Sequence, residues 1–151
     1  MTARRSGCPQ QLRERIHLAS LPMSDTEENA AIVNAIQRRS AVIAQKSLAE
    51  GFGLTVAEGM WKGKAVVASR VGGIRDQIAD GETGALVDTS DLESFGDAVV
   101  RLLEQPDLAA RIGDRARQHV KDRFLGPRHL RQYVDLLEAL VSAPRPPGRV
   151  V

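Results

Sequence analysis

Two carboxylates bracket a glycine turn in the stretch LAEGFGLTVAEGMWKGK, residues 48–64. Glu50 precedes the Gly-Phe-Gly turn at 51–53 and Glu58 follows it, with seven residues between the two acids. A carboxylate can accept hydrogen bonds from two neighbouring hydroxyls, such as those of a ribose. Glycines allow positive φ and let a ligand approach the backbone closely. The stretch therefore has the groups that bind a phosphate and a pair of hydroxyls.

The turn is expected between a buried strand at 41–45 and a helix at 54–61. In an open α/β sheet, ligands bind beyond the carboxyl ends of the strands. The free N–H groups of Gly53, Leu54 and Thr55 would open the helix, and a helix N-terminus attracts phosphate. Two glycines before a helix are also common packing devices, and Val56 stands where the dinucleotide fingerprint has its third glycine. From spacing alone, phosphate binding and simple packing both stay open.

The elements around the turn alternate between strands and helices. Helical patterns occupy 24–39, with Ser24 and Glu27 as a capping box, then 54–61 and a short segment from about Gly73. Between and before them lie four short runs typical of strands, at 15–20, 41–45, 65–69 and 84–87. The second and third runs are almost wholly apolar, as parallel strands covered on both faces are. The order predicts an α/β fold with a parallel sheet of about four strands.

The last third of the chain reads as three helices. One begins behind Asp91, a second begins at Pro106, where the first ends, and a third begins at Gly126 with apolar residues at helical spacing. Residues 143–151 contain three prolines and cannot continue a helix.

Composition excludes several classes of protein. The chain has 151 residues, enough for one domain with a real core. It has no apolar run of about 20 residues and no secretory leader, so we expect a cytoplasmic protein without a membrane partner. Cys8 is the only cysteine, and the three histidines lack metal-ligand spacing. Residues 16–142 carry 15 basic and 18 acidic side chains, so the basic balance comes from the ends and argues against a nucleic-acid partner.

The stretch QKSLAEGFGLTVAEGMWKGKAVVASRVGGIRDQIADGETGALV, residues 45–87, closely resembles retaining glycosyltransferases of the GT-B fold. The two acids match the diagnostic pair of that superfamily. EGFGLTVAE, MWKGK and VGGIRDQI are most similar to its trehalose-forming branch, the trehalose synthases that join a nucleotide-activated glucose to free glucose. The likeness covers residues 13–142 and implies a partial, Rossmann-like C-terminal domain that binds the sugar donor.

The resemblance also implies roles for single residues. Glu50 would be catalytic, facing the hydroxyls of the donor sugar near the reaction centre. The expected substrate-binding residues are the backbone of Gly51, Phe52 and Gly53 at the hexose, the amides of Leu54 and Thr55 at the diphosphate, and Glu58 at the ribose. The alternative for Phe52 is packing under the turn, and the loop of Gly72 and Gly73 lies near the donor or is only a turn. Retention by front-face reaction would need no metal and no cofactor beyond the nucleoside-diphosphate glucose.

The resemblance further implies missing parts. Family members have an N-terminal acceptor-binding domain and opening strands with an arginine and a lysine for the diphosphate, and the likeness begins after both. We expect a flexible basic tail at 1–12, a partial donor domain at 13–142 and a flexible tail at 143–151. Without the opening strands, strands 15–20 and 41–45 would be left unpaired or the sheet rearranged. Two hypotheses follow: a donor-binding part inactive alone, with a separate chain supplying the acceptor domain, or a catalytically dead remnant that binds a nucleotide or a partner. A trehalose phosphorylase-like fragment is the nearest enzymatic rival.

Overall fold

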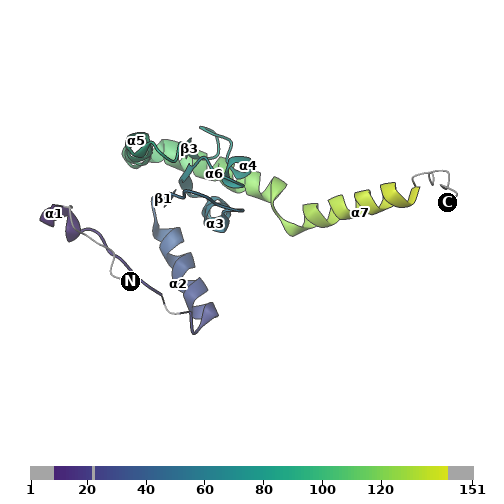
Figure 1. Cartoon of the computed structure of the whole chain (residues 1–151), viewed down its shortest axis with the longest axis horizontal. Coiled ribbons are helices and arrows are strands. Elements are labelled where there is room, and N and C mark those ends of the chain that lie inside the picture. Colours follow the sequence, from purple (N-terminus) through teal and green to yellow (C-terminus); the bar gives the residue numbers. More distant parts are fainter. Residues whose placement is uncertain (1–8, 22, 143–151) are drawn as a thin grey trace, which may run out of the picture. The chain divides into compact units, whose positions relative to one another are not determined.

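The computed structural model describes residues 9–21 and 23–142, so the predicted tail at 143–151 and most of that at 1–12 lie outside the described residues. The chain divides into two units, residues 1–34 and 35–151 (Figure 1). The described part of the first unit contains the short helix α1 (Gln10–Arg13) and the opening turns of α2 (Thr26–Arg39).

The start of α2 differs in detail from the prediction. The carboxylate of Asp25 accepts the N–H groups of Glu27 at 3.0 Å and Glu28 at 2.9 Å. Asp25, and not Ser24, is therefore the residue that caps the helix. Both residue types cap well, and the choice depends on which oxygen reaches the free amides.

The predicted strand at 15–20 is wrong. These residues are exposed and form no strand in the structure. Ile16 and Leu18 alternate with polar residues as in a half-buried strand, but alternation stabilises a strand only when a neighbouring strand supplies cross-strand contacts. The described chain offers residues 15–20 no such neighbour.

The second unit is built on a parallel sheet of three strands in the order β1 (Val42–Gln45), β2 (Ala65–Ser69) and β3 (Ala85–Val87). These strands lie within one residue of the predicted ends, which confirms the α/β class, although the sheet has three strands and not about four. Every residue of β2 is buried, as expected of an apolar run covered on both faces. Among the described residues, no strand pairs with the outer edge of β1.

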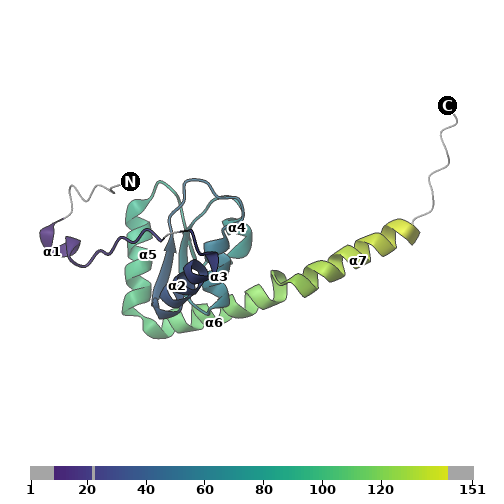
Figure 2. The same cartoon turned by 90° about the horizontal axis from the view of Figure 1, so that it is seen from below.

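Helices cover both faces of the sheet (Figure 2). On one face, α3 (Leu54–Trp61), α4 (Ile74–Gln77) and the second half of α6 (Pro106–Arg123) contribute Met60, Ile74 and Val120 to the core. On the other face, α5 (Leu92–Glu104) and the first half of α6 contribute Leu102 and Ile112. The central strand β2 is thus buried between helices, and the carboxyl ends of the strands are left to the loops.

The helix ends follow the local chemistry that the sequence contains. Asp91 caps α5 by accepting the N–H of Ser94 at 2.9 Å, and Pro106 is the first residue of α6. The last helix, α7 (Gly126–Ser142), begins where predicted, and all of its residues are exposed. No helix in the described parts of the chain combines the length and apolar content that crossing a membrane requires.

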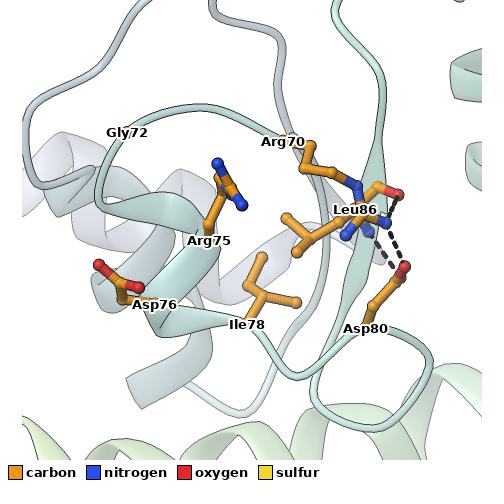
Figure 3. A pocket seen from close by; sticks show the side chains of 7 residues that line it. All are labelled: Arg70, Gly72, Arg75, Asp76, Ile78, Asp80 and Leu86. Carbon is orange, nitrogen blue, oxygen red and sulfur yellow. Dashed lines mark hydrogen bonds and ion pairs between the residues drawn. The ribbon is translucent and has the colours of Figure 1, made fainter.

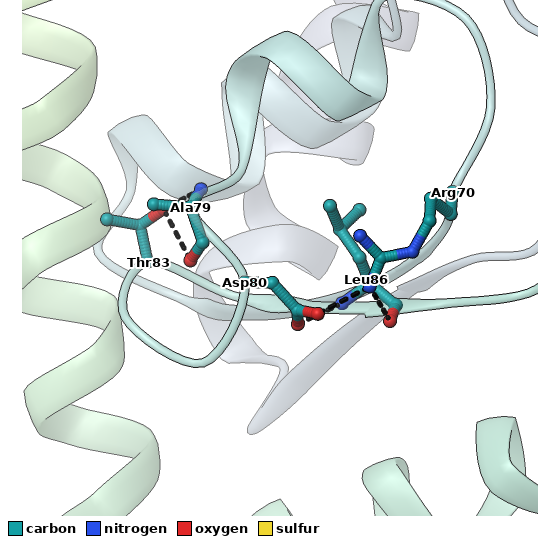
Figure 4. A network of polar contacts seen from close by, with 5 residues as sticks. All are labelled: Arg70, Ala79, Asp80, Thr83 and Leu86. Carbon is teal, nitrogen blue, oxygen red and sulfur yellow. Dashed lines mark hydrogen bonds and ion pairs between the residues drawn. The ribbon is translucent and has the colours of Figure 1, made fainter.

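The outer edge of β3 is closed by side chains and not by another strand (Figure 4). Asp80 accepts the N–H of Leu86 at 2.9 Å, and Arg70 donates to the carbonyl of Leu86 at 3.1 Å. Arg70 and Asp80 also form an ion pair at 2.5 Å. Because the polar backbone groups of Leu86 are occupied, this edge cannot readily recruit a further strand.

Candidate functional site

The glycine turn lies just beyond the carboxyl ends of β1 and β2, as predicted. The Nε2 of Gln45 donates to the hydroxyl of Ser47 at 2.9 Å, and the backbone N–H of Ser47 donates to the hydroxyl of Ser69 at 3.1 Å. Ser69 is buried at the end of β2. These bonds tie the segment that leads into the turn to the rigid end of the sheet.

Gly53 has a conformation and an environment that only glycine accommodates. Its φ is +85°, in the left-handed region, and it is the N-cap residue of α3. Its carbonyl accepts the N–H groups of Val56 at 3.0 Å and Ala57 at 3.2 Å, which starts the helix. A Cβ at this position would lie 2.8 Å from Cγ1 of Ile74, so a larger residue would push the turn away from α4.

The second glycine pair, Gly72 and Gly73, lies directly against the turn. The N–H of Gly73 donates to the carbonyl of Gly51 at 2.9 Å. A Cβ on Gly72 would collide with the carbonyl of Glu50, and one on Gly73 with that of Gly51. The structure therefore brings together two glycine motifs that the sequence separates by about twenty residues.

Four consecutive amides at the turn have no hydrogen-bond acceptor among the described residues. They are the N–H groups of Phe52, Gly53, Leu54 and Thr55. The amide before them, on Gly51, donates to the side chain of its neighbour Glu50 at 3.1 Å. Unpaired amides at the start of a helix, together with the positive end of its dipole, favour an anion.

The side chain of Phe52 is only partly packed. Its ring packs edge-on against Phe124 with 6.3 Å between the ring centroids, and Phe124 in turn contacts His119 at 5.7 Å. The side chain nevertheless remains 48% exposed. The ring thus packs against the residue that follows α6, and part of its surface stays open to solvent.

The two acids of the motif have different surroundings. Glu50 is half-buried at the start of the turn, whereas Glu58 is exposed on the second turn of α3. Glu58 accepts a hydrogen bond from Nε2 of Gln37 at 3.0 Å, and Lys62 donates to the other amide atom of Gln37 at 2.5 Å. Gln37 is itself buried, so Glu58 is held by a fixed partner.

Sequence reasoning missed two buried glutamines, Gln37 and Gln77. Gln77 is 1% exposed, and its Nε2 donates to the carbonyl of Phe52, while its Oε1 has no partner. The signal for Gln77 was its place between apolar Ile74 and Ile78, which points it inward with them. No comparable pattern marks Gln37.

His119 is the one residue near the turn for which the structure indicates a shifted pKa. Burial lowers its pKa, and the positive charge of Arg123 lowers it further. The charge of Asp122 and a backbone hydrogen bond to Gln77 act in the opposite direction. The net effect favours a neutral imidazole beneath the turn, with its Nε2 buried and unpartnered.

A polar cavity of about 500 Å³ lies beside Gly72 (Figure 3). Arg75 extends into it from α4, and Arg70 and Asp80 line its other side. The cavity contains none of the residues predicted to bind the donor. Across residues 9–21 and 23–142, no cluster of three or more histidine, cysteine or acidic residues could hold a metal ion.

Known proteins match the chain over most of its described length. Residues 23–119 match the family Glycosyl transferases group 1. A trehalose synthase of Pyrococcus horikoshii is 46% identical over 112 residues, which are 74% of this chain and 26% of that protein. The chain therefore spans about a quarter of the length of the curated relatives it matches.

Solved structures agree with the sequence match. A sucrose-phosphate synthase from Thermosynechococcus elongatus superposes with a TM-score of 0.70 at 30% identity, over 89% of this chain and 32% of its own. The Anabaena protein Alr3699/HepE, crystallised with UDP-glucose, has a TM-score of 0.64 at 23% identity, over 71% and 30% of the two chains, and shares the fold. The predicted resemblance to GT-B glycosyltransferases is confirmed. This chain belongs to the glycosyl transferases group 1 family, and its glycine turn and both acids lie inside the matched region.

Proposed function

We propose that this chain is the donor-binding part of a retaining, trehalose-forming glycosyltransferase, and that its glycine turn binds a nucleoside-diphosphate glucose. The observation that carries the proposal is the row of four amides at the start of α3 without an acceptor among the described residues. They lie in a stretch shared with relatives named trehalose synthase. The UDP-glucose bound by the Anabaena protein supports a donor of this chemical class.

In this proposal each group at the turn has one role. The amides of Leu54 and Thr55 bind the diphosphate, where the helix dipole adds to their effect. Glu58, one helical turn further on, accepts hydrogen bonds from the ribose hydroxyls. Glu50 and the backbone at 51–53 face the hexose. Gln37 holds the carboxylate of Glu58 before the donor arrives and shares it afterwards.

The reaction would proceed on one face of the donor sugar. The bond from the anomeric carbon to the diphosphate oxygen breaks, and the acceptor hydroxyl oxygen bonds to that carbon from the same side. The acceptor proton passes to an oxygen of the leaving diphosphate, so atoms and charges balance. The rate then depends on positioning and on donors aimed at the charge that develops on the leaving group.

Turnover by this chain alone should be small. Lys46 and Lys62 are the cations nearest the turn in sequence, and they donate to the carbonyl of Thr89 at 2.6 Å and to Gln37 at 2.5 Å. Both lysines are thus engaged elsewhere, and each charge-assisted bond that the diphosphate does not make costs about 1.5–3 kcal/mol. A separate chain that supplies the acceptor site and further cations would complete the enzyme.

Calorimetric titration with UDP and with ADP tests the proposal. Glu58→Gln should weaken binding about tenfold, because a charge-assisted hydrogen bond to the ribose is lost. Glu104→Gln, which removes an exposed acid at the end of α5, is the matched control and should leave the affinity unchanged. Equal affinities in the wild type and the Glu58 variant would contradict the proposal.

The second candidate is a catalytically inactive chain that serves as an interaction module. The exposed apolar side chains of α7 favour it. A product assay with labelled nucleoside-diphosphate glucose and glucose separates the candidates, because only the first predicts trehalose once a complementing acceptor domain is added. A second assay tests the phosphorylase-like alternative. It supplies trehalose and inorganic phosphate in place of the sugar nucleotide and glucose, and it measures the release of glucose phosphate.

A further inference from the structure

The carbonyl groups of the glycine turn are held from one side by the segment 72–77. Gly73 donates its N–H to the carbonyl of Gly51 at 2.9 Å. Nε2 of Gln77 donates to the carbonyl of the next residue, Phe52. Two successive peptide groups are therefore fixed by hydrogen bonds from the same short segment.

Fixing a carbonyl also fixes the amide of the same peptide group. A trans peptide is planar, and its N–H points opposite to its C=O. The carbonyl of Gly51 shares a plane with the N–H of Phe52, and the carbonyl of Phe52 shares a plane with the N–H of Gly53. Since both carbonyls point towards 72–77, both N–H groups point away from it, and neither has an acceptor among the described residues.

We propose that Gln77 is a positioning residue of this site: its carboxamide orients the Phe52–Gly53 peptide so that the amides at the turn face a sugar nucleotide. This inference rests on the proposed function. Gln77 does not touch the ligand and acts through the backbone of the turn.

The surroundings of Gln77 argue that its amide has a purpose beyond filling space. The residue is 1% exposed, and its Oε1 has no partner within residues 9–21 and 23–142, so burial of this polar group is not fully compensated there. An apolar side chain of the same length would fill the volume without that penalty, but it would leave the carbonyl of Phe52 without a donor. The hydrogen bond that glutamine donates to the carbonyl of Phe52 is therefore the reason we give for a buried polar side chain at position 77.

The remaining contacts of the turn explain why it cannot simply rotate to a different orientation. Gly72 and Gly73 approach the carbonyls of Glu50 and Gly51 so closely that a Cβ on either glycine would collide with them. On the other side, the ring of Phe52 rests on Phe124. Only the peptide after Phe52 depends on a single side-chain donor, which makes Gln77 the sensitive point.

Gln77→Met tests the inference, because methionine keeps the length and removes the donor. The affinity for UDP-glucose, measured by calorimetry, should fall about tenfold, the loss expected when one orienting hydrogen bond is removed. UDP-glucose is the probe because the amides of Phe52 and Gly53 are proposed to face the hexose. Thr83→Val is the matched control: Thr83 is buried and its hydroxyl bonds only to the backbone of Ala79. It should lower the unfolding temperature, because a buried hydrogen bond is lost, and leave the affinity for UDP-glucose within about twofold. Wild-type affinity in Gln77→Met would overturn the positioning role while the proposed function stands.

Gln77→Glu gives a signature that a purely structural role lacks. A carboxylate cannot donate to the carbonyl of Phe52, whereas a protonated carboxyl can, and burial raises the pKa of a carboxyl. The affinity of this variant for UDP-glucose, divided by that of the wild type, should therefore rise as the pH falls from about 8 to about 6. His119 on α6, flanked by Asp122 and Arg123, lies close to this position, and its titration would couple to that of a carboxyl at position 77. The same ratio is therefore also measured in a His119→Gln background, where the rise should persist. A ratio that does not change with pH would count against the inference.

Nuclear magnetic resonance of the nucleotide-free chain separates this inference from the proposed function. In Gln77→Met, the amide signals of Phe52 and Gly53 should shift and exchange faster with solvent deuterium, and in Thr83→Val they should not. If the wild-type chain bound neither UDP nor ADP, the proposed function would be overturned, and the positioning of a ligand with it. Unchanged amide signals in Gln77→Met would overturn the orientation of the turn itself.

Discussion

Helices α6 and α7 follow each other in the chain, have 18 and 17 residues, and have opposite surroundings. α6 lies against both faces of the sheet and buries Ile112, Ala116 and Val120. α7 buries no residue. Its large apolar side chains are all exposed, namely Leu130, Tyr133, Val134, Leu136, Leu137, Leu140 and Val141.

The difference shows that an apolar stripe predicts a helix but not a partner. Both helices carry apolar residues at helical spacing, so each forms where the sequence predicts it. Burial additionally needs a surface that fits, and α6 finds one because Gly113 lets it approach the carbonyl of Gly63. The stability of the domain should therefore depend strongly on α6 and weakly on α7.

The largest expected difference comes from truncating one apolar side chain on each helix. Ile112→Ala should lower the free energy of unfolding by about 3–4 kcal/mol, because it removes buried methyl groups and leaves a cavity between α6 and the sheet. Leu137→Ala should change it by less than about 0.5 kcal/mol, because this side chain is already exposed. Urea denaturation followed by circular dichroism measures both. Equal losses in the two variants would show that α7 is buried in solution.

A smaller difference is expected at the glycines of the two helices. Gly113→Ala should lower the free energy of unfolding by about 2–3 kcal/mol, because its Cβ would collide with the backbone of Gly63 and force α6 away from the loop that precedes β2. Gly126→Ala is the matched control at the start of α7, where a Cβ meets nothing within 4 Å. Thermal unfolding of the two variants decides the matter: a stable Gly113 variant would mean that the contact with Gly63 is loose.

The pH dependence of stability should also follow α6. Burial lowers the folded-state pKa of His119, and the charge of Arg123 adds to this, so protonation favours the unfolded chain. As the pH falls below about 6.5, the ordinary histidine value, His119 should lower the free energy of unfolding by a growing amount. The decrease should level off once the pH is below the folded-state pKa of His119. Urea midpoints between pH 7.5 and pH 5 should fall in the wild type and fall less in His119→Gln. Equal slopes would assign the dependence to other groups.

The comparison also explains how far the sequence could predict the fold. The strands at 41–45, 65–69 and 84–87 and the helix 54–61 were predictable because each is an uninterrupted local pattern, bounded by glycines or caps. The strand expected at 15–20 was not formed, because its alternation needs a neighbouring strand that the described chain does not offer. Asp25 replaced Ser24 as a cap because two capping residues stand side by side.

The candidate site divides in the same way. Its motif, from Glu50 to Glu58, could be found from residue types and spacing alone. Its supports could not, because Gln37 and Gln77 act across 21 and 25 residues of sequence, on Glu58 and Phe52. Such contacts depend on how the end of α2 and the helix α4 pack against α3 and the turn before it, and no local pattern encodes that packing.

The smallest expected change in the free energy of unfolding concerns α7, and it tests whether the apolar side chains of this helix are exposed. Leu137→Gln combined with Leu140→Gln should leave the free energy of unfolding within about 0.5 kcal/mol of wild type, because neither side chain loses a buried contact. The double variant should nevertheless bind less of the apolar dye ANS and stay monodisperse at higher protein concentration, because exposed apolar patches favour association. Arg131→Gln with Glu138→Gln, also exposed on α7, is the control for a general change of that surface. If the leucine variant instead unfolded at clearly lower urea, the face of α7 would be a buried part of the folded protein, and the contrast with α6 would be lost.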